Sequence, residues 1–151
     1  MAEKTDVVII GAGAAGMMCA IEAGKRGRRV AVLDHAKAPG EKIRISGGGR
    51  CNFTNRDAGP AHFLSANPHY CRSALARYKP ADFIALVDKH GIPYHEKKLG
   101  QLFCDNKASD ILDMLLAECD EAGAEIRMHT SIEQIEKTET GYLLQTSGGQ
   151  F

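Results

Sequence analysis

An α/β fold with a parallel sheet is predicted by three observations on the first 34 residues. The β-branched run Val7 to Ile10 fits a strand buried on both faces, as strands of parallel sheets are. A Gly-x-Gly-x-x-Gly turn at 11–16 follows directly and opens a helix expected at about 14–25. A second apolar run, Val30 to Leu33, predicts the next strand. Strand, glycine turn, helix and strand in this order predict a Rossmann-like domain.

The glycine turn has the spacing that binds a dinucleotide. Gly11 would allow the tight turn, Gly13 would let a pyrophosphate approach the backbone, and Gly16 would let the helix pack closely on the strand. The helix N-terminus, with the N–H groups of Ala14 and Ala15, would present partial positive charge to the phosphates. The alternative is a glycine-rich turn that binds no ligand.

An acidic residue ends the second predicted strand. Asp34 follows Gly16 by 18 residues, which is the position from which a carboxylate accepts hydrogen bonds from a ribose 2′-OH. His35 comes next, and it either contacts the adenine or is an exposed loop histidine, the simpler interpretation.

A second glycine run, with three consecutive glycines at 47–49, predicts neither helix nor strand. Its free N–H groups and nearby cations favour a backbone nest around an anion, and the alternative is a flexible linker. Arg50 would lower the pKa of the adjacent Cys51 thiol enough to form a thiolate. The candidate residues are Lys42, Ser46, Gly47, Gly48, Gly49, Arg50, Cys51 and Asn52.

These two motifs together resemble one bacterial family. The turn at 11–16, Lys42 and the string Ser46 to Asn55 are similar to the BaiN-like, or aminoacetone-oxidase-like, flavoproteins of the glutathione-reductase type. The resemblance implies an FAD-binding domain, electron transfer from NAD(P)H or a reduced substrate, and adenine hydrogen-bonded by backbone near Ile132. The sequence departs from that family at Cys104, where a proline is usual.

Composition limits the other classes of function. Hydrophobic residues make up 44% and charged residues 25%, which predicts a packed core within one ordinary domain, 1–151. The formal net charge is zero, so bulk charge favours neither a nucleic-acid nor a membrane partner. The five cysteines contain no C-x-x-C pair, which argues against a metal site or disulfide framework and for a cytoplasmic location. Cys19 and Cys119 are expected to be small core residues on helices.

The remaining pattern predicts further helices and antiparallel strands. Apolar spacing indicates helices at about 71–78, from Pro80, and at about 110–121. A strand is expected at 125–130, and hairpins at 92–104 and 131–146, with a third strand due where the chain stops.

Three hypotheses follow for the function. The first is the FAD-binding part of a flavin-dependent oxidoreductase that acts on a small molecule, and 1–151 would then be the N-terminal portion of a longer flavoprotein. The second is an NAD-binding Rossmann domain of a dehydrogenase, although such a domain has no need of the second glycine run. The third is a non-catalytic nucleotide-binding fragment. No catalytic residue and no oligomeric state is assigned.

Overall fold

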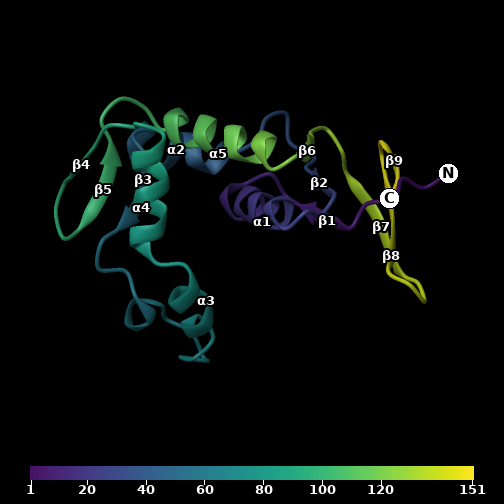
Figure 1. Cartoon of the computed structure of the whole chain (residues 1–151), viewed down its shortest axis with the longest axis horizontal. Coiled ribbons are helices and arrows are strands. Elements are labelled where there is room, and N and C mark those ends of the chain that lie inside the picture. Colours follow the sequence, from purple (N-terminus) through teal and green to yellow (C-terminus); the bar gives the residue numbers. More distant parts are fainter. The chain divides into compact units, whose positions relative to one another are not determined.

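The computed structural model describes all 151 residues, which form two compact units (Figure 1). Unit 1 comprises Met1–Lys42 and Leu115–Phe151, and unit 2 comprises Ile43–Met114. Helix α5, Ser109–Glu121, runs from unit 2 into unit 1.

A three-stranded parallel sheet forms the centre of unit 1. Its order is β1-β2-β6, with β1 at Val7–Ile10, β2 at Val30–Leu33 and β6 at Ala124–Arg127. Helix α1, Ala14–Lys25, is the crossover between β1 and β2. Ile10 pairs with Leu33, so the carboxyl ends of the two strands meet at one edge. This arrangement confirms the predicted Rossmann-like α/β fold with a parallel sheet.

The buried strand of this sheet is β2, whereas the sequence indicated β1. All four β2 residues are buried, but in β1 only Ile9 is, and Ile10 is 56% exposed. The physical reason is position, because β2 has a neighbour on each side and β1 pairs only with β2 in this sheet. A run of Val and Ile indicates a strand but does not specify a central one.

On its buried face, helix α1 lies close to other backbone at Gly24. A side chain at Gly24 would come within 2.3 Å of the Ala122 carbonyl oxygen. Met17, Ala20 and Ile21 share that face and are buried. Cys19 projects from a different face and is exposed, so its predicted place in the core was wrong.

Helix α5 packs its carboxyl-terminal half within unit 1. Cys119 is buried, as predicted, with its Sγ 3.6 Å from the Met17 carbonyl oxygen. Glu118 is fully buried and pairs with Lys25 Nζ at 2.8 Å. Burial of a carboxylate is costly without such a partner.

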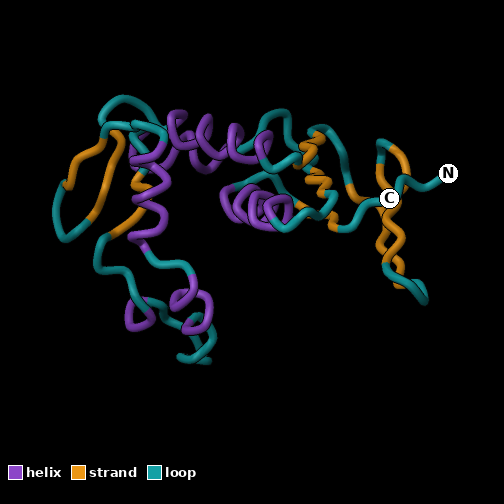
Figure 2. Tube along the Cα trace, in the orientation of Figure 1, coloured by secondary structure: helices purple, strands orange, loops and turns teal.

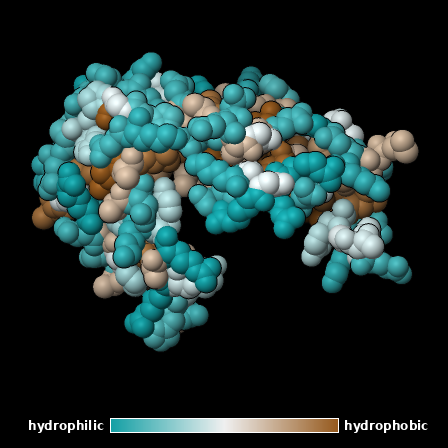
Figure 3. All heavy atoms as spheres, in the orientation of Figure 1, coloured by the Kyte–Doolittle hydropathy of each residue, from teal (hydrophilic) through white to brown (hydrophobic).

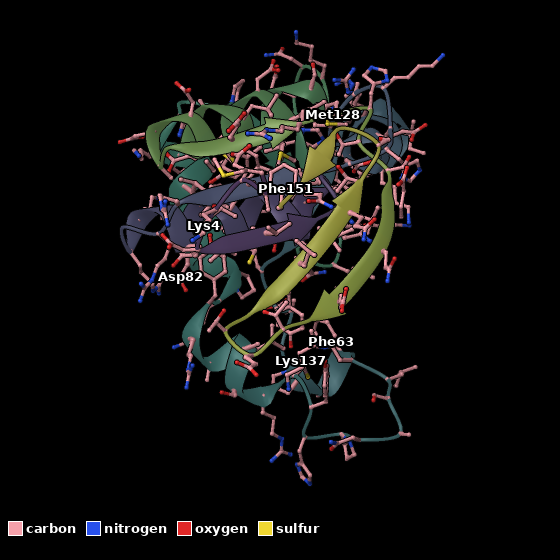
Figure 4. The ribbon with its side chains drawn as sticks, turned by 90° about the vertical axis from the view of Figure 1, so that its right-hand side faces the viewer. Lys4, Phe63, Asp82, Met128, Lys137 and Phe151 are labelled. Carbon is pink, nitrogen blue, oxygen red and sulfur yellow. The ribbon has the colours of Figure 1, made fainter.

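An antiparallel sheet completes unit 1. Strands β7 (Ile132–Lys137) and β8 (Tyr142–Thr146) form the predicted hairpin, and β9 (Gly149–Gln150) adds the third strand within the chain. Phe151 follows β9 and packs with Ala31, Leu33 and Leu144, which joins the two sheets (Figure 4).

Unit 2 contains a separate antiparallel sheet in which β5 (Gln101–Cys104) lies between β3 (Asn52–Asn55) and β4 (Tyr94–Glu96) (Figure 2). The predicted hairpin of β4 and β5 is confirmed, and β3 adds to it on the other side of β5. Phe53 of β3 packs against Phe83 of α4 (Pro80–Lys89) and edge-on to Tyr94 of β4, with ring centroids 6.1 and 5.4 Å away. The elements are α2 (Glu41–Ile45), a 3₁₀ turn (Ser46–Gly49), β3 (Asn52–Asn55), a 3₁₀ turn (Pro60–His62), α3 (Arg72–Arg77), α4 (Pro80–Lys89), β4 (Tyr94–Glu96) and β5 (Gln101–Cys104).

Hydrophilic side chains predominate on the face drawn in Figure 3. None of the helices combines the length and the apolar character that crossing a bilayer requires.

Candidate nucleotide-binding site

A pocket of about 520 Å³ opens at the carboxyl ends of β1 and β2. Ligands of open α/β sheets bind at this edge. The pocket is therefore where the predicted dinucleotide site should be, and it lies wholly within unit 1. Its lining residues are Ile10, Gly11, Leu33, Asp34, His35, Thr130, Ser131 and Ile132.

The three glycines of the first turn differ in what surrounds them. Gly11 has φ +107°, a conformation that favours glycine, and its N–H donates to the Leu33 carbonyl oxygen (2.8 Å). A Cβ on Gly16 would lie 1.8 Å from the Gly11 carbonyl oxygen, so the helix could not pack on the turn. Gly13 has no atom within 4 Å of its Cβ position, so the backbone there is open to a ligand.

The start of α1 is oriented for an anion. Gly13 is the N-cap, and its carbonyl oxygen accepts the Met17 N–H (3.0 Å). The N–H groups of Ala14, Ala15 and Gly16 belong to the first turn, so they have no acceptor within the helix. Both alanines are exposed. This set fits the diphosphate of a dinucleotide.

The Asp34 carboxylate has a structural role that the sequence did not reveal. Oδ2 accepts the Ala12 N–H (2.7 Å) and Oδ1 accepts the Ala36 N–H (2.8 Å). The hydrogen bond from the Ala36 N–H has the larger effect and that from Ala12 the smaller, and together they hold the pKa of Asp34 below its usual range. The group is therefore ionised at neutral pH. Because a carboxylate oxygen has two lone pairs, each oxygen can still accept a ribose hydroxyl. Asp34 therefore fixes the glycine turn and remains available to a ligand.

The rim of the pocket combines predicted residues with others that sequence patterns missed. His35 is 83% exposed, which agrees with a loop histidine, and its Nδ1 is 3.7 Å from Asp34 Oδ1. Ile132 begins β7, and Thr130 and Ser131 precede it in a segment that no motif marks. The Thr130 N–H donates to the carbonyl oxygen of Asp34 (2.8 Å), so the residue that follows β2 holds this segment in place.

The second glycine run forms a short turn that is neither a regular helix nor a strand, as predicted. It lies in unit 2 and forms a 3₁₀ turn after α2, with Gly47 and Gly48 in left-handed conformations (φ +57° and +66°). The N–H groups of Arg50 and Cys51 donate to carbonyl oxygens of Gly47 (3.4 Å) and Ser46 (3.0 Å). These two N–H groups are therefore engaged within the turn, and the expected nest of glycine N–H groups around an anion stays a prediction.

Cys51 is a buried thiol, not the predicted thiolate. Burial raises its pKa, and the hydrogen bond with Ser46 offsets this only in part. Arg50 is exposed, and its guanidinium donates to the Asp105 carbonyl oxygen. Lys42 is exposed on α2, and Asn52 begins β3. The positive charges near this turn therefore do not govern the thiol.

The parallel sheet, its crossover helix and the pocket at the strand ends define a Rossmann-like domain. Residues 5–151 match the HI0933-like protein Rossmann domain, and the chain belongs to that family.

Curated relatives are similar over nearly the whole chain. The chain is 54% identical over 146 residues to "Ribosomal RNA dihydrouridine synthase" of Escherichia coli and 49% identical over 155 residues to the protein of the same name from Haemophilus influenzae. The two alignments cover 97% and 100% of this chain but only 36% and 39% of those relatives, so the chain spans less than half of their length. A third relative, "3-dehydro-bile acid delta(4,6)-reductase" of Clostridium scindens, is 24% identical over 95% of this chain and 36% of that protein.

Solved structures share the fold at low identity. The glycine oxidase of Geobacillus kaustophilus matches with a TM-score of 0.63 at 19% identity, over 97% of this chain and 52% of that one. This likeness supports the fold alone.

Proposed function

We propose that this chain binds FAD at the pocket of unit 1 and is the FAD-binding part of a longer flavin-dependent reductase. The observation that carries the proposal is the contrast within the first turn, where Gly16 is packed and Gly13 is open above the first N–H groups of α1. That contrast is what a pyrophosphate-binding turn requires.

The residues around the pocket fit the parts of FAD. The diphosphate would lie against Gly11, Gly13 and the start of α1, and the adenosine ribose against the free lone pairs of Asp34. Backbone near Ile132 would bond the adenine edge. Lys42 and the segment 46–52 would serve the flavin end. When bound and reduced, FAD supplies a hydride equivalent, with NAD(P)H as the proposed donor.

The names of the relatives suggest a reaction class. Dihydrouridine is uridine reduced at its C5–C6 double bond, which is conjugated to the C4 carbonyl. A delta(4,6)-reductase that acts on a 3-dehydro steroid also reduces carbon–carbon double bonds conjugated to a carbonyl. We propose that the full-length protein reduces such a bond, with uridine of ribosomal RNA as the first substrate to test. The BaiN-like resemblance would instead imply reduction of such a bond in a small molecule.

The distribution of charge supports an RNA substrate better than the net charge does. Ten of the 19 basic and seven of the 19 acidic residues fall in unit 2, a net charge of +3, against −3 in unit 1. The expectation of no nucleic-acid partner came from the net charge of the whole chain, which is zero because the charges of the two units cancel. Basic groups on one unit suit contacts with phosphate.

The test is purification of the full-length protein. We expect a yellow protein with FAD released on denaturation, reduction of that flavin by NAD(P)H without oxygen, and dihydrouridine in ribosomal RNA from cells that express it. A colourless protein that takes up no FAD contradicts the proposal. Tight binding of NADH without flavin would favour the dehydrogenase hypothesis, and reduction of an enone but not of RNA would favour a small-molecule substrate.

A further inference from the structure

The positive net charge of unit 2 resides in one segment between β3 and α4. Residues 58–79, which we call the basic segment, contain three cationic side chains and no acidic one: Arg72, Arg77 and Lys79. Of the ten basic residues of unit 2, the other seven lie outside this segment, and so do all seven of its acidic residues. The rest of unit 2 is therefore neutral, and the basic segment carries the net charge of +3.

Aromatic side chains alternate with these cations in the sequence and are open to solvent. Phe63 is 49% exposed and Tyr70 is 82% exposed. Helix α3 (Arg72–Arg77), which belongs to the same segment, buries no residue and lies apart from β4 and β5 of its own unit (Figure 1). Rings this exposed contribute little to the core of unit 2 and are open to a partner.

The cations of the basic segment are not neutralised by carboxylates of the chain. Arg72, Arg77 and Lys79 are exposed and form no ion pair. The nearest carboxylate in the sequence, Asp82, accepts the backbone N–H of Lys79 (2.6 Å) and so caps α4 instead. These side chains can therefore meet the phosphates of a ligand without first breaking an ion pair.

A pocket of about 580 Å³ lies within the basic segment. Phe63, Ser65 and Arg72 are among the residues that line it. Local hydrogen bonds shape the loop, because the Asn67 N–H donates to Ser65 Oγ (3.2 Å) and the His69 N–H donates to Asn67 Oδ1 (3.0 Å). An aromatic face and a guanidinium in one hollow suit a nucleotide, whose base stacks on the ring and whose phosphate binds the cation.

We propose that the basic segment is a binding surface for single-stranded RNA, with a base stacked on Phe63 and phosphates bound by Arg72, Arg77 and Lys79. This inference rests on the proposed function, which makes RNA the first substrate to test. Unpaired bases are free to stack on aromatic side chains, whereas paired ones are not. Another part of a longer chain is a poorer occupant, because it would bury cations that have no carboxylate partner. The surface supplies affinity for the RNA and takes no part in the chemistry.

The first experiment removes charge from the full-length protein. One variant replaces Arg72, Arg77 and Lys79 by glutamine, and a charge-matched control replaces three exposed lysines outside the segment: Lys4, Lys98 and Lys137. The affinity for an unmodified single-stranded fragment of ribosomal RNA is measured at several salt concentrations. We expect the first variant to bind about 10-fold or more weaker at 0.1 M salt. The slope of log affinity against log salt should fall by about 2, which is the loss of three phosphate contacts.

The second experiment removes a ring without changing charge. Phe63→Leu keeps an apolar side chain but loses the stacking face, and Tyr142→Leu is the control because Tyr142 is an exposed ring of unit 1. We expect Phe63→Leu to weaken RNA binding by about 5-fold or more with the salt slope unchanged, and Tyr142→Leu to bind as the wild type. FAD content and the rate of flavin reduction by NAD(P)H should equal the wild type in every variant.

Three results would overturn the inference while the proposed function stands. The first is wild-type RNA affinity in the variant without the three cations, and the second is an equal loss in its charge-matched control. The third is a lower melting temperature with unchanged RNA affinity, which would show that another part of the protein covers the segment. A wild-type protein that contains FAD but neither binds this RNA nor forms dihydrouridine overturns the proposed RNA substrate and this inference together.

Discussion

Glycine serves two different physical purposes in the two glycine-rich turns of this chain. In the turn at 11–16, Gly16 avoids a collision between a helix and a carbonyl oxygen, and Gly13 leaves the backbone uncovered. In the run at 47–49, all three residues have left-handed φ, and only Gly47 lies against other atoms. Glycine in the first turn therefore permits close helix packing and leaves backbone uncovered, whereas glycine in the second permits left-handed backbone and close packing of the chain on itself.

The largest effect is expected at Gly16. In Gly16→Ala the new Cβ would need the space of a backbone oxygen 1.8 Å away, so α1 must move off the turn. We expect a loss of about 3 kcal/mol in the free energy of unfolding, measured with urea, and loss of FAD binding. Stability and FAD affinity equal to the wild type would show that the helix does not pack on the turn as described.

A smaller effect should separate two glycines of the second run. Gly47→Ala combines left-handed strain with a Cβ 2.6 Å from the Asn52 nitrogen, and about 2 kcal/mol of destabilisation is expected. Gly48→Ala has similar φ but open space, so about 1 kcal/mol should be lost through strain alone. Equal losses for the two variants would remove packing from the explanation.

The structural role of Asp34 in the first turn should appear in the pH dependence of stability. Its folded pKa is lowered by two backbone N–H groups, so its contribution to stability is complete above the unfolded value of about 3.9 and is lost as pH falls through the folded value. Asp34→Asn places an NH₂ group against an N–H donor and should cost about 1 kcal/mol at pH 7. From pH 6 to pH 3 this variant should lose less stability than the wild type, and parallel pH curves would contradict the assigned role.

The smallest effect concerns reactivity rather than stability. Cys19 of unit 1 is exposed, whereas Cys51 and Cys104 of unit 2 are buried, and burial raises the pKa of Cys104 to about 12. Iodoacetamide at pH 7.5 should therefore modify Cys19 at least about 100-fold faster than either buried thiol. Mass spectrometry of the modified peptides measures this, and rapid modification of Cys51 would restore the thiolate hypothesis.

Local patterns predicted what depends on neighbours in the sequence. The strand, glycine turn and crossover helix of unit 1 follow from residue types at short spacing, and so do the β4–β5 and β7–β8 hairpins. The burial of β2 rather than β1, and the exposure of Cys19, depend on which elements pack together, which no window of the sequence contains. The predicted thiolate at Cys51 failed for the same reason, because burial outweighed an adjacent arginine.

The sequence predicted only some of the residues that line the candidate site. Gly11, Asp34 and His35 carry motif signals and line the pocket. Thr130 and Ser131 line it too, but a hydrogen bond between residues 96 positions apart, from Thr130 to Asp34, holds them there. Contacts of that range require the fold.

The most direct test of the account compares FAD binding by Gly13→Ala and Gly141→Ala in the full-length protein. Neither glycine has left-handed φ, and neither has an atom within 4 Å of its Cβ position, so both variants should stay within about 1 kcal/mol of wild-type stability. Only Gly13 lies at the start of α1. We predict that Gly13→Ala weakens FAD binding by about 10-fold or more while Gly141→Ala leaves it unchanged. Wild-type FAD affinity in a stable Gly13→Ala protein would contradict the claim that the pyrophosphate lies on this turn.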